Sequence, residues 1–277
     1  MIRYTLALSW IVILIGIVSL TVKGGPTYGI DFRGGTLFQV KFTRQVSAAD
    51  IRSAVSGMGT QSSSVQGFGA AAENEFLINI ESEVEDLEQF SDQFKGALET
   101  KFGKDSFEIR RSEAVGPKVG KDLRQKAMLA VLFSCIGMLI YMWFRFELRF
   151  GLGAVLGLVH DVLIVMTFLS LTNTPIDLTV VAALLTIVGY SVNDTIIVCD
   201  RIRENMPKMT RQKFSDIINF SVNQTLSRTV LTVGTTLLAA LALFMFGGAV
   251  IHDFAFTMLI GVITGTYSSV FVACPVA

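Results

Sequence analysis

The chain has 277 residues, of which 51% are hydrophobic and only 17% are charged, and its formal net charge is zero. A soluble domain of this size carries more charge, whereas here the apolar residues form blocks of about 20, the length that crosses a bilayer. The sequence therefore predicts an integral membrane protein. The zero net charge and the lack of a basic tract argue against a nucleic-acid partner. The three cysteines lie in apolar runs without CxxC or metal-ligand spacing, and we interpret them as small buried residues.

The first apolar run extends from Tyr4 to Val22 and follows Arg3. A secretory signal peptide is the alternative interpretation. However, this run of about 19 residues is longer than the usual hydrophobic region of a signal, and no A-x-A-like cleavage site follows it. We therefore expect residues 1–23 to form an uncleaved first transmembrane helix.

Residues 24–126 have the composition of a soluble domain, with acidic and basic side chains nearly balanced. Ser47 and Asp50 form a capping-box-like helix start, with Asp in place of the usual Glu or Gln. Hydrophobic periodicity predicts strands at 36–42, 62–68, 75–80 and 106–115, helices at 47–58 and 84–102, and a turn at 69–74. The order β-α-β-β-α-β is that of a ferredoxin-like α+β domain.

Five more apolar runs follow a predicted helix breaker at Gly116-Pro117. They cover residues 127–144, 151–171, 178–199, 226–246 and 254–277. With the first run they make six predicted transmembrane helices, so residues 127–277 form helices two to six. The sequence ends on Pro275-Val276-Ala277 without a basic tail, and we expect the natural C-terminus to lie further on.

The distribution of lysine and arginine predicts the orientation in the membrane, because short cytoplasmic loops carry an excess of both. One set of loops and ends contains Arg3, Arg145, Arg149, Arg201, Arg203, Lys208, Arg211 and Lys213. The loops 172–177 and 247–253 contain neither residue type. We therefore expect both termini to be cytoplasmic and residues 24–126 to lie outside.

An aspartate inside the fourth apolar run is the most costly residue of the membrane part. Insertion scales assign about 2.5–3.5 kcal/mol to an aspartate at the centre of a membrane helix, so Asp194 needs a compensating partner. Arg228, the one arginine near the start of the next run, is the obvious candidate. If the helix that carries Asp194 reaches the inner membrane surface at Asp200, Asp194 lies about 9 Å inside the membrane. If the next helix enters the membrane near Val222 or Asn223, Arg228 lies at about the same depth.

Other polar residues accompany this pair. In the fourth apolar run, helical spacing places one set of residues on a single face: Thr186, Tyr190, Asn193, Asp194 and Ile197. In the fifth run it does the same for Arg228, Thr232 and Thr235. A buried aspartate near an arginine can take up and release protons as that arginine moves. Two simpler interpretations stay open: a static ion pair that locks the helices, and an arginine that reaches back to the inner surface.

A second polar point lies in the third run, where His160 and Asp161 fall near mid-depth. A lone histidine here is typical of a packing residue, whereas its pairing with Asp161 is also consistent with proton handling or gating. The sequence has no phosphate-binding loop, nucleophile elbow or metal-spaced His/Cys set, so we expect neither enzymatic activity nor a bound metal or cofactor.

A series of short motifs runs along nearly the whole chain. They are GIDFRGGT at 29–36, VGPKVG at 115–120, FRFE at 144–147, HDV at 160–162, DLTVVA at 177–182, residues 189–205, and QTLSRT at 224–229. In this order they resemble the SecD/SecF family of bacterial Sec protein-export membrane subunits, and the similarity is to the SecF side of that family. The chain departs from the family pattern mainly at its C-terminal end.

The resemblance implies a six-helix half of an RND-type transporter fold, with SecD as the other half. It also implies an auxiliary subunit of the Sec translocase that uses the proton-motive force in late-stage preprotein translocation across the bacterial cytoplasmic (inner) membrane. The implied partners are SecD, the SecYEG translocon with YajC- or YidC-type subunits, the unfolded preprotein and the lipid bilayer.

The family's proton-coupling residues map by motif onto Asp194, Arg228 and Thr232. Asn193, Tyr190, His160 and Asp161 rank behind them as intramembrane polar candidates. Two alternatives stay open: a structural assembly subunit without its own proton path, and a half-transporter for lipids or drugs, which the small outer domain disfavours.

Overall fold

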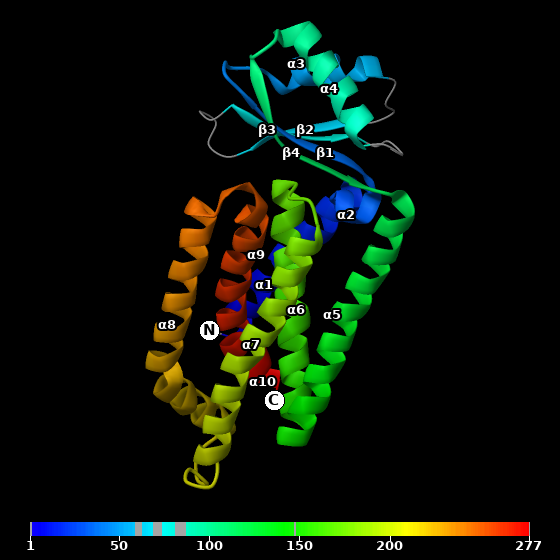
Figure 1. Cartoon of the computed structure of the whole chain (residues 1–277). Coiled ribbons are helices and arrows are strands. Elements are labelled where there is room, and N and C mark those ends of the chain that lie inside the picture. The colour runs from blue at the N-terminus through cyan, green and yellow to red at the C-terminus, as the bar shows by residue number, and fades with distance from the viewer. Residues whose placement is uncertain (1, 59–62, 69–73, 81–86, 147, 277) are drawn as a thin grey trace. The chain divides into compact units, whose positions relative to one another are not determined.

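The computed structural model describes residues 2–58, 63–68, 74–80, 87–146 and 148–276 (Figure 1). Contacts between residues divide the chain into two compact units. We call residues 28–126 the sheet unit, and residues 1–27 together with 127–277 the helical unit. Each unit is described by itself.

The sheet unit contains one four-stranded antiparallel sheet. Its elements in chain order are α2 (Ile30–Arg33), β1 (Gly35–Phe42), α3 (Ala48–Val55), the 3₁₀ turn η1 (Ser56–Met58), β2 (Ser63–Phe68), β3 (Glu75–Ile80), α4 (Leu87–Phe102) and β4 (Phe107–Val115). The strand order is β2-β3-β1-β4, with every neighbouring pair antiparallel. This confirms the ferredoxin-like arrangement that the sequence predicts.

The core of this unit lies between the sheet and the helices α3 and α4, which cover one face (Figure 1). Phe38 and Val40 alternate with polar residues along β1, so both point to that face, where they are fully buried. The rings of Phe38 and Phe94, which comes from α4, stack with centroids 3.9 Å apart. The predicted turn at 69–74, except for Asn74, and the predicted helical residues 84–86 lie outside the described residues.

Ser47 caps the N-terminus of α3. Its hydroxyl oxygen accepts a hydrogen bond from the Asp50 backbone N–H at 3.2 Å and donates one to the Asp50 carboxylate at 2.6 Å. A glutamate at this position would reach back to the backbone N–H of the cap residue. The shorter aspartate bonds the cap hydroxyl instead, so the local start of the helix is kept with a different bond.

Pro117 begins a helix rather than ending one, which corrects the prediction of a break. α5 extends from Pro117 to Arg145 and crosses the boundary between the two units. Proline is favoured at the first helical position because its missing N–H is not needed there. Residues 117–126 are too polar to count as part of a membrane run, so hydropathy placed the start at residue 127.

The first turn of α5 makes a close backbone contact with the segment before β1. A Cβ added to Gly120 would lie 3.0 Å from the Gly34 nitrogen and 3.1 Å from the Phe32 carbonyl carbon. Gly34 itself has a φ of 81° and lies against Pro117. Both positions need glycine, one for space and one also for its backbone conformation.

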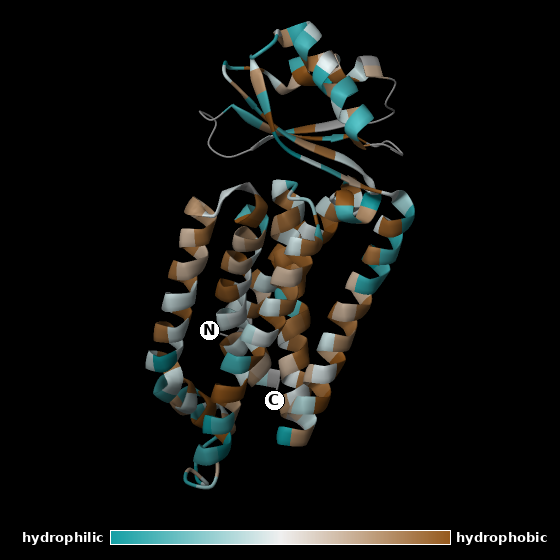
Figure 2. Ribbon diagram, in the orientation of Figure 1, coloured by the Kyte–Doolittle hydropathy of each residue, from teal (hydrophilic) through white to brown (hydrophobic). Residues whose placement is uncertain are grey.

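The helical unit contains six helices that are long and apolar enough to cross a membrane, within the part of the chain that the structure describes. They are α1 (Ile2–Val22), α5, α6 (Leu148–Thr172), α7 (Leu178–Asn205), α8 (Phe214–Phe246) and α9 (Gly248–Ser268). α9 continues as a π-helical turn (Ser269–Ala273) and the short α10 (Cys274–Val276). Figure 2 shows hydrophobic residues along these helices and hydrophilic ones around the α7–α8 loop.

The centre of the helical unit is formed by α6, α7 and α9. Half or more of the apolar segment of each is buried (50–56%), against 6–17% for α1, α5 and α8. Small residues permit the close helix crossings. Gly16 of α1 lies against Thr167 of α6, and Gly261 of α9 lies against Ile187 of α7. The helices α6, α7 and α9 are therefore in close contact with one another.

Other helix boundaries also differ from the sequence prediction, and α7 ends at Asn205 rather than at residue 199. α8 begins at Phe214 rather than at residue 226, because the intervening segment is polar on one side and does not register as an apolar run. The predicted loop 247–253 is reduced to a turn at Gly247-Gly248, where Gly248 has a φ of 69° and α9 begins. Residues 249–253 are therefore helical.

Candidate intramembrane site

Asp194 lies in the middle of α7 and is only 3% exposed. One carboxylate oxygen, Oδ2, is buried without a hydrogen-bond partner among the described residues. One helical turn earlier, the hydroxyl of Tyr190 is also buried without a hydrogen-bond partner among the described residues. Buried polar atoms without partners are rare in native proteins and require an explanation, such as a proton, an ion or a moving partner.

Arg228, the predicted partner, is exposed on α8. In the described part of the chain its guanidinium makes no hydrogen bond, and no ion pair of 4.0 Å or less joins it to Asp194. Its charge is nevertheless close enough to act on Asp194. The structure thus brings the two residues into the same region and leaves them separate.

Hydrogen bonds near the α7–α8 loop set the relative level of these residues. Asn205, at the end of α7, donates to Ser221 Oγ and to Gln224 Oε1, both at 2.9 Å. Counted at 1.5 Å per residue from Asn205 on α7 and from its partner Ser221 on α8, Asp194 and Thr232 both lie about 16 Å along their helices, and Arg228 about 10 Å. Arg228 is therefore about one turn nearer the loop than Asp194, rather than at the same depth.

The buried face of α8 differs from the predicted one. Ser221, Thr225 and Thr229 are buried, whereas Arg228 and Thr235 are exposed. Thr232 is half-buried, and its hydroxyl donates to the backbone carbonyls of Arg228 and Thr229, both at 3.1 Å. On α7, Asn193 and Thr186 are exposed and Tyr190 is half-buried. The predicted polar stripes therefore face partly outward in this chain.

The most complete polar cluster surrounds Asp161, which is fully buried on α6. Its Oδ2 accepts hydrogen bonds from Ser191 of α7 at 2.6 Å and from Ser268 of α9 at 2.8 Å. Its Oδ1 lies 3.1 Å from Nδ1 of the neighbouring His160. We call Asp161, Ser191 and Ser268 the carboxylate–serine cluster.

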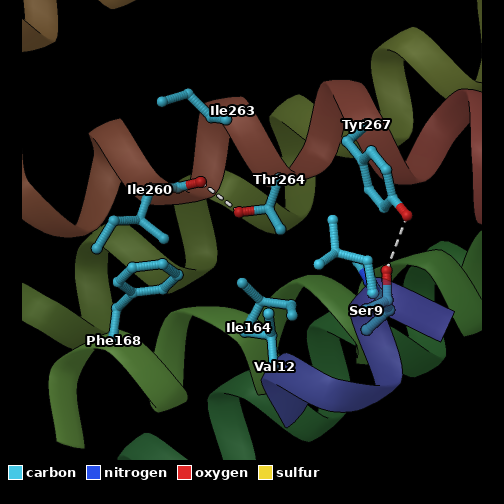
Figure 3. Close-up of a pocket in the computed structure, with 10 residues that line it drawn as sticks. Ser9, Val12, Ile164, Phe168, Ile260, Ile263, Thr264 and Tyr267 are labelled. Atoms are coloured by element: carbon cyan, nitrogen blue, oxygen red, sulfur yellow. Dashed lines mark hydrogen bonds between the residues drawn. The ribbon is translucent and has the colours of Figure 1, made fainter. Parts of the chain in front are cut away.

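His160 joins this cluster to α1. Its ring stacks on Tyr267 with centroids 5.9 Å apart. The Tyr267 hydroxyl donates to the Thr5 carbonyl at 2.6 Å. It also accepts from the Ser9 hydroxyl at 2.9 Å (Figure 3). His160 Nε2 is buried without a partner among the described residues.

A pocket of about 350 Å³ lies beside His160, between α1, α6 and α9. Most of its lining is apolar, as Figure 3 shows for Val12, Ile164 and Phe168. The Thr264 hydroxyl in its wall donates to the carbonyl of Ile260 on the same helix. The wall therefore offers few groups that could bind water or a polar ligand.

Sequence reasoning missed Ser191, Ser268 and Tyr267. Ser191 lies inside the motif that contains Asp194, which was a usable signal. Ser268 and Tyr267 had none, because serine and tyrosine are unremarkable in an apolar run until the helix that faces them is known. No group of three metal-ligating side chains that could hold a metal ion is found in the described residues.

Two family models match the chain. The model described as "Protein export membrane protein SecD/SecF, C-terminal" matches residues 95–277, and "SecD/SecF GG Motif" matches residues 18–46. The second match includes Gly34, which lies against Pro117 at the start of α5, and Gly35, the first residue of β1. Asp194, Arg228 and the carboxylate–serine cluster lie within the first match.

Similar proteins carry the name Protein translocase subunit SecF. The one from Magnetococcus marinus is 50% identical over 264 residues, which cover 94% of this chain and 84% of the relative. The one from Vibrio alginolyticus is 46% identical over 250 residues, covering 90% and 79%.

A solved structure of SecDF from Thermus thermophilus, described as a translocon-associated membrane protein, superposes with a TM-score of 0.88 at 36% identity. The match covers 99% of this chain and 37% of that one. A second structure, of SecDF in a super-membrane-facing form, gives a TM-score of 0.68. These matches confirm the expected fold, half of an RND-type membrane protein with a small α+β domain. The chain is a multi-pass membrane protein that belongs to the SecD/SecF family of protein-export membrane proteins.

Proposed function

We propose that this chain is the auxiliary subunit of a Sec translocase that, together with SecD, uses the proton-motive force to promote late-stage preprotein translocation. One observation carries the proposal: Asp194 is buried at the middle of a membrane helix, and its carboxylate oxygen Oδ2 has no hydrogen-bond partner among the described residues. The exposed Arg228 lies about one turn nearer the α7–α8 loop and forms no ion pair within the described part of the chain. Family membership supplies the setting of protein export.

The arrangement suits a group that gains and loses a proton. A carboxylate without a compensating partner is costly in the membrane, and it can be relieved either by a proton or by the approach of Arg228. Movement of α8 against α7 would bring Arg228 toward Asp194 as the proton leaves, and would take it away as a proton binds. One charge crossing 100 mV provides about 2.3 kcal/mol, enough for a modest conformational step.

Partners and location follow from the same proposal. SecD supplies the other half of the fold, and the SecYEG translocon, YajC- or YidC-type subunits and the unfolded preprotein complete the assembly in the bacterial cytoplasmic membrane. The lysine and arginine distribution supports cytoplasmic termini and an exported segment 24–126. The exposed apolar surfaces of α1, α5 and α8 provide area for lipid and for a second half.

The test is preprotein translocation into vesicles that carry the SecD partner, measured with and without a proton gradient. Arg228→Ala is expected to assemble and to lose only the increment that depends on the gradient. Arg203→Ala, which removes an exposed arginine paired with Asp200 at the end of α7, is the matched control and keeps the increment. An equal gradient response in wild type and Arg228→Ala would refute the coupling role.

A structural assembly subunit without a proton path is the second candidate. The fully satisfied cluster at Asp161 favours it, because such a cluster stabilises helix packing without any transport. This candidate predicts that exchanging the two charges, with Asp194→Arg and Arg228→Asp together, preserves activity. The proton-coupled subunit loses its gradient response in that exchange.

A further inference from the structure

Two carboxylates lie buried in the helical unit in opposite environments. Among the described residues, Asp194 has an oxygen without a hydrogen-bond partner, whereas both oxygens of Asp161 lie within hydrogen-bond distance of groups from its own helix and two others. Buried titratable groups with such different surroundings usually have different tasks. The proposed function uses Asp194 and leaves the task of Asp161 open.

The bonds of Asp161 join three helices at one point. The oxygen–oxygen distances of 2.6 Å to Ser191 and 2.8 Å to Ser268 are typical of strong hydroxyl–carboxylate bonds. Since Asp161 is on α6, Ser191 on α7 and Ser268 on α9, a single oxygen holds the three central helices together.

Small residues around the cluster allow this close approach. A Cβ on Gly265 of α9 would lie 3.0 Å from the Ser191 Cβ, and one on Gly157 of α6 would lie 3.8 Å from the Ser268 hydroxyl. The helices are therefore near their closest distance where the cluster forms. A sideways shift of α7 would either break the bonds to Asp161 or push Ser191 into α9.

The surroundings of Asp161 do not favour proton exchange with water. On the side of His160 lies the apolar pocket, where the Ser9, Thr264 and Tyr267 hydroxyls already donate hydrogen bonds. His160 lies between Asp161 and this pocket, but its Nε2 has no hydrogen-bond partner among the described residues, so the hydrogen bonds from Asp161 end at His160.

α8 is held differently. Asn205 joins it to α7 near the loop, and further along its buried face carries Thr225 and Thr229. The hydroxyls of Thr225 and Thr232 bond to the backbone of α8 itself. Such a face packs closely with α7 and α9 while leaving its hydroxyls satisfied when the helix moves.

We infer that Asp161 is a positioning residue that fixes α7 to α6 and α9 through Ser191 and Ser268, so that Asp194 stays on a rigid frame while α8 and Arg228 move. The inference rests on the proposed proton-coupled function. It assigns the two carboxylates distinct roles: Asp194 exchanges the proton, and Asp161 holds the helix that carries it.

Two substitutions of Asp161 separate positioning from proton exchange. In Asp161→Asn the amide oxygen can still accept from Ser191 and Ser268, so the gradient-dependent increment of translocation is expected to stay within about twofold of wild type. In Asp161→Leu both acceptors are lost and the increment is expected to fall about tenfold or more. Asp194→Asn, measured beside them, abolishes it.

A loss in Asp161→Asn as complete as that in Asp194→Asn would overturn the inference, because asparagine keeps the acceptor and removes only the exchangeable proton. Wild-type activity in Asp161→Leu would also overturn it. If wild type itself shows no gradient-dependent increment, the proposed function fails. The positioning of α7 is then tested by a separate measurement, the distance between spin labels on α7 and α9.

The spin-label measurement does not depend on transport. Ser191→Ala combined with Ser268→Ala keeps Asp161 and removes both serine bonds. With spin labels at the exposed positions Thr186 on α7 and Ile263 on α9, the distribution of distances is expected to be broader in this variant than in the labelled protein that keeps both serines. An unchanged distribution in the double variant would contradict the positioning role.

Discussion

At the scale of single residues, the hydrogen bonds available to each carboxyl group decide what it can do. The exposed carboxyl of Asp50 illustrates this outside the membrane. The hydrogen bond from the Ser47 hydroxyl, helped by the nearby charge of Lys101, lowers the pKa of Asp50 below the usual aspartate value. The folded state therefore holds this group ionised more strongly than the unfolded state does.

The lowered pKa of Asp50 predicts a pH dependence of stability. Its contribution is present above the unfolded aspartate pKa of about 3.9 and is lost as the pH falls through the lower folded value. Thermal unfolding of the purified protein below about pH 4 should therefore depend less steeply on pH in Asp50→Asn. Asp105→Asn, which leaves the helix cap intact, is the control; equal slopes in wild type and Asp50→Asn would contradict the assignment.

Single glycines show the same dependence on immediate surroundings. Gly120→Val is expected to destabilise the sheet unit by about 1–3 kcal/mol, because the added carbons meet the backbone of Phe32 and Gly34. Gly116→Ala is the control, since a Cβ there meets nothing within 4 Å. Denaturant unfolding of the two variants checks this, and a Gly120→Val protein as stable as Gly116→Ala would disprove the close contact.

At the scale of elements, the sequence predicted the order and type of helices and strands better than their ends. The six membrane helices and the ferredoxin-like order are confirmed, because apolar runs and alternation report burial directly. The starts of α5 and α8 were missed because their first turns are polar. Hydropathy detects the part of a helix inside the bilayer and not its extension into water.

The candidate site, too, could be predicted from the sequence only in part. That Asp194 would be buried followed from its place in an apolar run. Its level relative to Arg228 did not, because this depends on where two helices actually begin and end. The cluster of Asp161, Ser191 and Ser268 could not be predicted either, since it depends on how three helices are rotated toward one another.

The crossing of α1 and α6 provides a test at this scale. Gly16 lies against Thr167, and Ser19 and Ser170 share a hydrogen bond of 2.8 Å one turn further along. Gly16→Leu is expected to separate the helices and cost about 1–3 kcal/mol, measured by unfolding in detergent. Gly137→Leu on α5, where added atoms start in open space, should cost less; the reverse order would refute the packing described.

At the scale of the whole molecule, this chain spans 37% of the length of the solved SecDF chain that it matches. Its central helices are buried against one another, while α1, α5 and α8 remain largely exposed. Arg228 of α8 and Asn193 of α7 are also exposed, and the proposed second half or lipid would cover them. The site is therefore complete on one side only.

The proposed orientation can be measured directly. Lys104→Cys in the sheet unit should react with a membrane-impermeant maleimide in spheroplasts. Lys208→Cys in the α7–α8 loop should react only after the membrane is opened. The unsubstituted protein is the control, because Cys135 and Cys199 lie in membrane helices and Cys274 is fully buried in α10. Labelling of Lys208→Cys in intact spheroplasts would contradict the proposed orientation.

The central claim is that Asp194 exchanges the proton that drives translocation. The most direct measurement compares Asp194→Asn with Asp200→Asn in vesicles with the SecD partner, with and without a proton gradient. Asp200 pairs with Arg203 at the exposed end of the same helix and serves as the matched carboxylate. We expect Asp194→Asn to assemble normally and lose the whole gradient-dependent increment, while Asp200→Asn keeps it. A normal gradient response in Asp194→Asn would contradict the account.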